Sequence, residues 1–456
     1  MPVPSSTSSL RKLHVITWGC QMNVYDSARM QDVLKPIGYR ATAFPEEADM
    51  IILNTCHIRD KAAEKVFSEL GRLRLIKQAR EKEGQQTILA VAGCVAQAEG
   101  KEILTRAPYV DIVLGPQTYH RLPEMVARIA RAGKTVIETD FPVEQKFDFL
   151  PAPTTENQLT AFLTIQEGCD KFCSFCVVPY TRGVESSRPV SSVLAEARAL
   201  IKMGAGEITL LGQNVNAYHG LTEDGQPCTL ADLIKSLAAL PGLKRIRYTT
   251  SHPRDMSDDL VEAHKEIPAL MPFIHLPVQS GSNKILLAMN RGHQAGFYME
   301  WIEKLKRARP DVAISSDFIV GYPGETDKDF EDTMSLVKQV GFAQAYSFKY
   351  SPRPGTPAAN APGQLPEDVK DERLYQLQDL LRSQQDSFNQ TLVNKVVNVY
   401  FTGKGRKDGQ ITGRSPYLQP VHVIGDETLI GQERPVYISQ QLTNSLGGQI
   451  KELENT

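Results

Sequence analysis

The 456-residue chain has no apolar run near the length of about 20 residues that a membrane-spanning helix requires. Its first residues, Met1–Lys12, are rich in Ser and Pro and lack the apolar core of a secretory signal. Positive charge is not in excess, since the formal net charge is −2, so any nucleic-acid surface must be a local basic patch. These absences predict a cytoplasmic protein with a disordered tail over 1–12 and no membrane partner.

Cysteine is also scarce. The chain has seven cysteines, an odd number, and they are spread thinly, which argues against a disulfide scaffold. Metal binding or catalysis is the better interpretation for cysteines that cluster. Cys169, Cys173 and Cys176 lie within eight positions of one another, directly after a predicted strand. Three thiolates can ligate three irons of a cubic cluster and leave the fourth iron open to a small molecule. The alternative, structural zinc, is disfavoured because it takes four ligands and no second cysteine pair lies nearby.

Short apolar runs alternate with helix-like stretches in a first domain predicted to cover 13–139, which indicates βαβ units and a parallel sheet. Its expected strands are Leu13–Thr17, Met50–Leu53, Ile88–Ala92 and Val110–Leu114. A polar, Pro-rich segment over 140–158 is predicted to be a linker.

A second alternation of strands and helices covers 159–386, and its six repeats predict a partial barrel, short of the usual eight units. Its expected strands are Ala161–Gln166, Glu207–Leu211, Arg245–Thr250, Phe273–Pro277, Ala313–Val320 and Ala343–Tyr350. An open doubly wound sheet would show similar spacing. From 387 to 451, short strands separated by Gly and Pro predict a small β-barrel.

Three further cysteines, Cys20, Cys56 and Cys94, each follow one of the first three predicted strands. In a parallel sheet these loops emerge at the same edge, so the three thiols are expected to converge. A single cysteine there would be an ordinary buried residue, whereas three at equivalent strand ends favour a second iron–sulfur cluster, again with one open iron. Cys228 has no such context and is predicted to be a free thiol.

The central motif, Cys-x-x-x-Cys-x-Phe-Cys with Phe175 as its aromatic residue, resembles the signature of the radical S-adenosylmethionine (SAM) superfamily. The resemblance implies that SAM chelates the open iron and is cleaved reductively to methionine and a 5′-deoxyadenosyl radical, which abstracts a hydrogen atom. His252 and His275 are candidates for proton transfer, but a packed or hydrogen-bonded structural role is the better interpretation of each. Besides Phe175, cofactor contacts are expected at the strand ends, where an ordinary turn is the alternative for each residue. They are Gly212, Gln213, Gln279, Gly321, Pro323 and Gly324.

The chain as a whole resembles the methylthiotransferases. The shared features are two cysteine trios, a flavodoxin-like N-terminal domain over 13–139, called the front domain below, a partial (β/α)6 radical SAM barrel and a small β module. The segments Thr17–Asn23 and Cys176–Gly183 resemble the tRNA-modifying branch, the MiaB type. The protein-modifying branch, the RimO type, usually carries Pro-Lys in place of Gln21-Met22. Departures at Arg291–His293 and Ser415–Gln419 touch no predicted cluster ligand and bear on RNA contacts instead.

The resemblance implies a tRNA substrate whose adenosine next to the anticodon bears an N6-isopentenyl group, and a product with a methylthio group at C2. It implies two [4Fe–4S] clusters and SAM as cofactors. The implied partners of this monomer are the tRNA anticodon loop, a low-potential electron donor of the flavodoxin or ferredoxin type, and proteins that supply sulfur or clusters.

The β module resembles a TRAM domain, an RNA-binding barrel, and its basic residues are compatible with phosphate contacts. An ordinary solvated basic surface is the alternative. The residues expected to contact RNA, in this module and near the central cluster, are Arg182, Arg188, Lys404, Arg406, Lys407 and Arg414.

Three other functions compete with this prediction. A protein methylthiotransferase would act on a ribosomal protein, a non-enzymatic iron–sulfur redox or RNA-binding protein would not cleave SAM, and a radical methyltransferase would use the front cluster only for electrons. The residues beside Cys20 favour the tRNA branch over the first of these.

Overall fold

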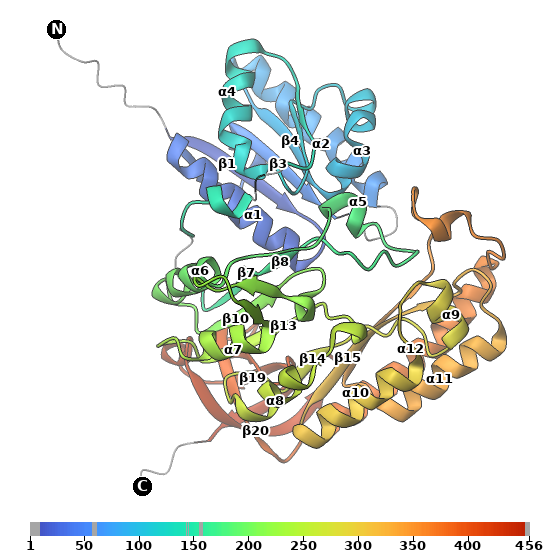
Figure 1. Cartoon of the computed structure of the whole chain (residues 1–456). Coiled ribbons are helices and arrows are strands. Elements are labelled where there is room, and N and C mark those ends of the chain that lie inside the picture. Colours follow the sequence, from blue (N-terminus) through green and yellow to red (C-terminus); the bar gives the residue numbers. More distant parts are fainter. Residues whose placement is uncertain (1–9, 57–61, 143, 145, 155–157, 452–456) are drawn as a thin grey trace. The chain divides into compact units, whose positions relative to one another are not determined.

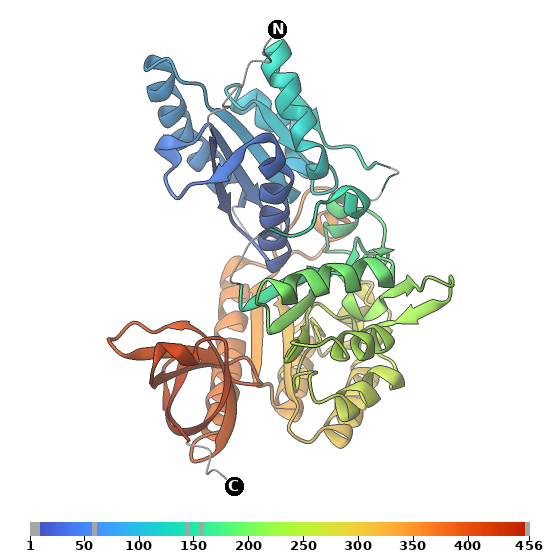
Figure 2. The same cartoon turned by 90° about the vertical axis from the view of Figure 1, so that its left-hand side faces the viewer.

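The computed structural model describes residues 10–56, 62–142, 144, 146–154 and 158–451 (Figures 1 and 2). Most of the tail predicted over 1–12 lies outside these residues. The chain divides into two compact units, of which the first comprises Met1–Thr155, Glu167–Asp170 and Val177–Ser186, and the second the rest. Within the described ranges, no helix combines the length and apolar character needed to cross a membrane.

The first unit is built on a six-stranded sheet of order β2-β1-β3-β4-β5-β6, in which every pair is parallel. Its strands are β1 (Arg11–Thr17), β2 (Tyr39–Ala41), β3 (Met50–Thr55), β4 (Ile88–Gly93), β5 (Ile112–Leu114) and β6 (Val136–Glu138). The four expected strands are present. The two that the sequence did not reveal, β2 and β6, are three-residue edge strands whose partial exposure leaves no apolar run.

Helices cover both faces of this sheet (Figure 1). They are α1 (Gln21–Leu34), α2 (Ala62–Lys82), α3 (Cys94–Arg106) and α4 (Leu122–Ala132), with a short α5 (Val178–Arg182) from later in the chain. Alternate residues of β3 divide between two cores, Ile52 with α1 and α4, and Ile51 with α2 and α3. All six residues of β3 are therefore buried, as a central strand between two helical layers requires.

The second unit contains the six strands expected of a partial barrel, as two parallel three-stranded sheets. One has the order β13-β10-β7 and the other β14-β15-β16, and a single parallel bridge links Ile246 to Leu270, just before β14. Pro272 and Pro277 flank β14 and cannot donate to a ladder, which explains why it is so short. The strands are β7 (Thr160–Thr164), β10 (Glu207–Leu211), β13 (Arg245–Tyr248), β14 (Phe273–His275), β15 (Ala313–Val320) and β16 (Gln344–Lys349).

Helices cover the outer face of these strands. They are α6 (Val190–Lys202), α7 (Leu230–Ala238), α8 (Asp258–Glu266), α10 (Ala295–Ala308), α11 (Asp327–Val340) and α12 (Glu367–Gln390), with a short α9 (Asn283–Ala288) between β14 and α10. The outward residues Ile208, Ile246 and Ile314 join the helices in one apolar core. Because strand residues alternate between faces, Arg245 and Asp317 lie on the opposite, inner face, which is polar.

The C-terminal residues close into a five-stranded barrel of order β17-β18-β19-β21-β20 (Figure 2). Its strands are β17 (Val396–Lys404), β18 (Gln410–Arg414), β19 (Pro420–Ile424), β20 (Glu433–Leu442) and β21 (Ser445–Ile450). The last strand, β21, was not among the predicted strands, because its Ser-Leu-Gly-Gly-Gln-Ile pattern contains two glycines.

Buried arginines join this small barrel to the inner face of the β10–β13 sheet. Arg245, fully buried, donates to the carbonyls of Arg414 and Asn398 at 2.9 Å, and Arg247 donates to the carbonyls of Pro416 and Ser415 at 2.7 and 3.0 Å. The departure noted at Ser415–Gln419 therefore lies in the loop that packs the barrel against this sheet, and its bearing on RNA contacts stays a prediction.

Candidate iron–sulfur and cofactor sites

Cys20, Cys56 and Cys94 meet at the carboxyl edge of β1, β3 and β4. Cys20 precedes α1, Cys56 follows β3, and Cys94 is the first residue of α3. The Cys56 thiol hydrogen-bonds with both Cys20 and Cys94. The structure thus brings together three thiols that lie far apart in the sequence, and two of them, Cys56 and Cys94, are only 6% exposed.

Two glycines allow these strand ends to approach one another. Gly19 has φ +132°, and a Cβ there would lie 2.3 Å from the Cβ of Cys56. Gly93 has φ +90°, and its Cβ would lie 2.4 Å from the Thr55 carbonyl oxygen. Both positions require a left-handed backbone and leave no room for a side chain, so glycine is needed at each.

An amide network underlies the same edge. The Cys20 thiol donates to Asn23 Oδ1 at 3.1 Å, and Asn23 Nδ2 donates to Asn54 Oδ1 at 3.1 Å. Asn54 in turn donates to Ser27 Oγ at 2.9 Å. Both asparagines are completely buried, so their hydrogen bonds hold α1 against β3 directly below the thiols.

The electrostatics of this site favour thiolates. The hydrogen bond from Cys56 lowers the pKa of Cys20 to about 7 and that of Cys94 to about 6, against burial, and the positive charge of Arg182 lowers both further. The pKa of Cys56 is raised, because its proton is shared with the two neighbouring thiolates. Low-pKa thiolates beside a cation are the form in which cysteine binds metals.

The three thiols therefore form a donor set that fits an iron–sulfur cluster, although in this structure they hydrogen-bond to one another. As they stand, the described residues contain no group of three His, Cys, Asp or Glu side chains placed to hold a metal ion. Cluster binding by Cys20, Cys56 and Cys94 would require these side chains to turn apart, so that each thiolate reaches a different iron.

The central cysteines lie on a tightly anchored loop. Gly168 before Cys169 has φ +73°, and a Cβ there would lie 1.9 Å from the Val184 carbonyl oxygen. The Cys169 N–H donates to the Gly183 carbonyl at 3.2 Å, and the Cys176 N–H donates to the Cys173 carbonyl at 2.9 Å.

Neighbouring groups surround Cys173 and the motif aromatic. Arg291 Nη1 donates to the Cys173 sulfur at 3.5 Å, so the expectation that the departure at Arg291–His293 touches no predicted cluster ligand was wrong. The ring of Phe175, which was expected to contact the cofactor, is partly buried against an apolar cluster that includes Tyr322 and Ile285. The Phe175 ring therefore supports the cysteine loop by apolar packing.

Unsatisfied polar atoms gather near the carboxyl ends of β10, β13 and β14. Each belongs to a side chain at most 9% exposed and has no hydrogen-bond partner within the described residues. These atoms are Asn214 Oδ1, Ser251 Oγ, His252 Nε2, Gln279 Oε1 and Arg291 Nε. Because buried polar groups without partners are costly, such a group at strand ends indicates a polar ligand, as the amino, carboxylate and hydroxyl groups of SAM would provide.

Two of the predicted cofactor residues lie within this region on a fixed backbone. The N–H groups of Gln213 and Asn214 donate to Gln166 Oε1 at 2.9 and 3.1 Å, and a Cβ on Gly212 would lie 2.5 Å from the same oxygen. Gln279 has φ +75° and is 9% exposed. Burial, with the charge of Arg291, lowers the pKa of His252, so this histidine is neutral, and the structure gives it no direct sign of proton transfer.

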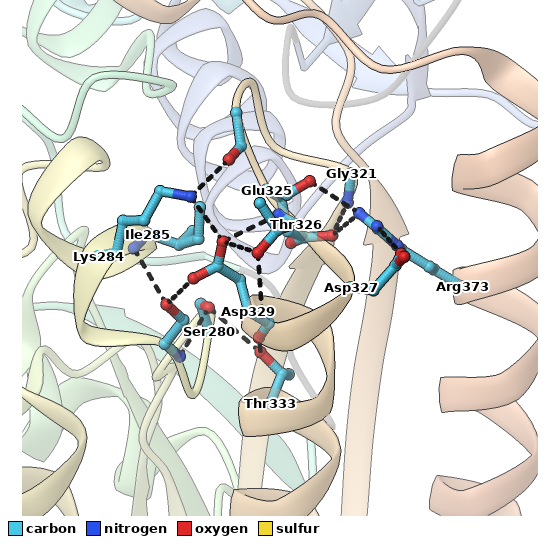
Figure 3. A network of polar contacts seen from close by, with 12 residues as sticks. Ser280, Lys284, Ile285, Gly321, Glu325, Thr326, Asp327, Asp329, Thr333 and Arg373 are labelled. Atoms are coloured by element: carbon cyan, nitrogen blue, oxygen red, sulfur yellow. Dashed lines mark hydrogen bonds and ion pairs between the residues drawn. The ribbon is translucent and has the colours of Figure 1, made fainter.

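The loop after β15 carries the predicted residues Gly321, Pro323 and Gly324, and it is held by the polar network of Figure 3. Glu325 Oε1 accepts from the Gly321 N–H and from Arg373 of α12, each at 2.8 Å. Gly321 has φ +70°, and a Cβ there would lie 2.4 Å from Lys370 Cγ. The α12 helix thus fixes the shape of this loop.

The same network ties this loop to the one after β14 (Figure 3). Lys284 donates to the Gly324 carbonyl at 2.9 Å and to Asp329 at 2.8 Å, and Ser282 donates to Asp329 at 2.7 Å. Thr326 caps α11 and pairs reciprocally with Asp329. The two loops that present Gln279 and Gly321 are therefore braced against each other.

Two of the predicted RNA contacts need correction. Arg182 and Arg188 are buried, with side chains 3% and 4% exposed, and are paired with carboxylates, Arg182 with Asp26 and Arg188 with Glu196. Neither guanidinium can reach a phosphate from these positions.

The other predicted RNA contacts lie on the surface of the small barrel. Lys404, Arg406, Lys407 and Arg414 are exposed, although Lys404 pairs with Glu427 at 2.7 Å. Their contact with RNA stays a prediction. The expected free thiol, Cys228, forms no disulfide, donates to the Thr229 carbonyl at 3.5 Å and packs in the helix-covered core.

The sequence carries little signal for three further charged side chains that surround Arg182, namely Asp26, Lys146 and Glu167. Glu167 directly precedes Gly168-Cys169, which is the one sequence signal available. Lys146 lies in the segment predicted as a linker, yet it is 1% exposed and packed in the first unit.

Comparison with known proteins agrees with this geometry. Residues 12–115 match the model of uncharacterized protein family UPF0004, and residues 163–337 match that of the radical SAM superfamily. Similar folds occur in the cobalamin-dependent SAM radical enzyme OxsB (13% identity, TM-score 0.54) and in the radical SAM methyltransferase TsrM from Kitasatospora setae (12% identity, TM-score 0.57). The alignments cover 81% and 77% of this chain but 56% of OxsB and 75% of TsrM.

The radical SAM match implies SAM and one [4Fe–4S] cluster, for which the central cysteines and the unsatisfied polar atoms at the strand ends are a suitable setting. The front match covers the domain that carries the other three thiols. Residues 163–337 thus form a radical SAM domain, and the two matched domains, in this order, support the radical SAM methylthiotransferase family.

Proposed function

We propose that the chain is a tRNA methylthiotransferase, which converts N6-isopentenyladenosine next to the anticodon to 2-methylthio-N6-isopentenyladenosine. The proposal rests mainly on the second trio of thiols, which lies in the UPF0004-matched domain of a chain that also carries a radical SAM domain. A methyltransferase needs only one such centre for its chemistry, whereas transfer of a methylthio group also needs a site that supplies sulfur. Cys20, Cys56 and Cys94 would hold that second cluster.

The target C–H bond at C2 is aromatic and not acidic, so no side chain acting as a base could activate it. SAM bound at the cluster of Cys169, Cys173 and Cys176 supplies the radical chemistry that this bond requires. The protein residues position the reactants. The braced loops around Gln279 and Gly321 would fix the cofactor, and Arg291 would donate to the Cys173 thiolate.

The inner face of the radical SAM sheet supports a nucleobase as substrate. Tyr346 and Phe348 of β16 are 49% and 52% exposed, although both lie on the inner face of the sheet. His275 lies 6.2 Å from the Tyr346 ring, edge to face, and its Nε2 is 3.5 Å from Asp317. Exposed aromatic rings beside polar groups are the surfaces on which unpaired bases stack and are read.

The decisive experiment is mass spectrometry of tRNA nucleosides from a deletion strain that carries plasmid copies of the gene. The wild type is expected to restore the methylthio nucleoside, and Cys173→Ala and Cys56→Ala to leave only isopentenyladenosine. Cys228→Ala is the matched control, because it removes a buried thiol outside both trios. A low-potential electron donor must be present in the host.

Unchanged methylthioadenosine in the deletion strain would contradict the proposal. Loss of a methylthio group from a ribosomal protein in the same strain would instead indicate the protein-modifying activity.

A further inference from the structure

Four charged side chains form a buried group in the first unit. Asp26, Lys146, Glu167 and Arg182 come from four different segments, and their side chains are 0–3% exposed. Arg182 Nη2 lies 2.6 Å from Asp26, Arg182 Nη1 lies 2.8 Å from Glu167, and Lys146 Nζ lies 2.7 Å from Glu167. Burying ions is costly, so this arrangement needs a reason beyond stability.

The group extends to the front thiols through Arg182. Its positive charge lies close enough to Cys94 and Cys20 to lower the pKa of both thiols. Its helix, α5, packs against α3, which begins with Cys94, and Gln117 Nε2 donates to the Arg182 carbonyl at 2.9 Å. A guanidinium has five N–H donors in a fixed fork, so Arg182 can bind both carboxylates and still face a sulfur.

The charges explain why a second cation is present. Lys146 and Arg182 balance Asp26 and Glu167, so the group is neutral before any thiolate forms. Thiolate ligands then add negative charge next to Arg182, and reduction of a cluster adds one more. A buried cation at that point stabilises both the ligands and the reduced state.

We propose that Arg182 is a positioning residue of the front site, which orients the Cys94 thiolate and raises the reduction potential of the cluster held by Cys20, Cys56 and Cys94. Asp26, Glu167 and Lys146 hold the guanidinium in place. The inference rests on the proposed second cluster. It also assigns a role to the segment after the central cysteine motif, since Arg182 lies six residues beyond Cys176.

The test uses the full chain with Cys169, Cys173 and Cys176 replaced by Ala, so that only the front site can bind iron. This parent is reconstituted anaerobically with iron and sulfide. Iron per chain, the rate of iron loss to EDTA and the midpoint potential followed by electron paramagnetic resonance are then compared for Arg182→Gln and Arg182→Lys. Supporting groups around metal ligands typically change affinity at least tenfold, so Arg182→Gln is expected to lose iron about tenfold faster and to be reduced at lower potential.

Arg182→Lys is expected to keep most of the potential, because it keeps the charge, but to release iron at an intermediate rate. Arg188→Gln is the matched control, since it also removes a buried arginine from its carboxylate, and it should match the parent. Equal iron retention and potential in Arg182→Gln and the parent would overturn the role of Arg182 alone. A folded parent that takes up no iron would overturn the second cluster and this inference together.

Discussion

The two cysteine trios differ in what brings their thiols together. The central three lie within eight positions of one another on a single loop. The front three are brought together by three parallel strands that end at one edge, and they are surrounded by a buried charge group. A site formed by a single loop can be recognised from the sequence spacing of its residues. A site formed at the edge of a sheet can be recognised only after the strands have been assigned.

The largest effect is expected when one thiol is removed from each trio. Cys173→Ala is expected to abolish both 5′-deoxyadenosine formation and methylthio transfer, because it removes a ligand of the cluster that binds SAM. Cys56→Ala is expected to abolish transfer while SAM cleavage continues. Chromatography of the reduced, reconstituted enzymes measures both products. Equal loss of cleavage in the two variants would show that the sites are not chemically separate.

The thiol electrostatics can be tested in metal-free protein. With its pKa lowered to about 7 from an ordinary 9.0, Cys20 is largely protonated below pH 6 and largely thiolate above pH 8. Its alkylation by iodoacetamide should therefore rise with a midpoint near pH 7, and at pH 7 roughly half of it is thiolate. Cys228, whose pKa is raised by burial, should stay unreactive there. Peptide mass spectrometry gives both rates, and a Cys20 midpoint near 9 would contradict this prediction.

Backbone geometry at the front site should matter more than at an ordinary helix position. Gly93→Ala places a Cβ 2.4 Å from the Thr55 oxygen at φ +90°, and should destabilise the front sheet by about 1–3 kcal/mol while lowering front-site iron. Gly71→Ala, where no atom lies within 4 Å, is the control and should be neutral or slightly stabilising. Urea unfolding and iron analysis provide the measurement; similar stability for the two variants would be the contrary result.

The smallest effect is expected on the small barrel, far in sequence from both trios. Replacing Lys404, Arg406 and Lys407 with Ala should weaken binding of an anticodon stem-loop and reduce the salt dependence of log Kd by up to about one unit per lost phosphate contact. SAM cleavage without RNA should not change. Fluorescence anisotropy at several salt concentrations tests this, and an unaltered salt slope would remove these residues from the RNA interface.

Most regular elements could be predicted because their signals are local. Strands such as Glu207–Leu211 and Ala313–Val320 follow directly from short apolar runs. The edge strands β2 and β6 could not, because short, half-exposed segments carry no such period. The hairpin of β11 (His219–Leu221) and β12 (Pro227–Thr229), which contains Cys228, was missed for the same reason.

The parallel order of strands and helices, and with it the edge where Cys20, Cys56 and Cys94 meet, could be read from the residue pattern, because alternating apolar periods imply one direction for every strand. The surroundings of Arg182, which binds Asp26 across 156 positions of the chain, emerge only in the folded protein. An arginine shows the same chemistry in sequence whether it faces RNA or a buried carboxylate. Burial and the arrival of partners from distant segments make that choice, and neither leaves a local pattern.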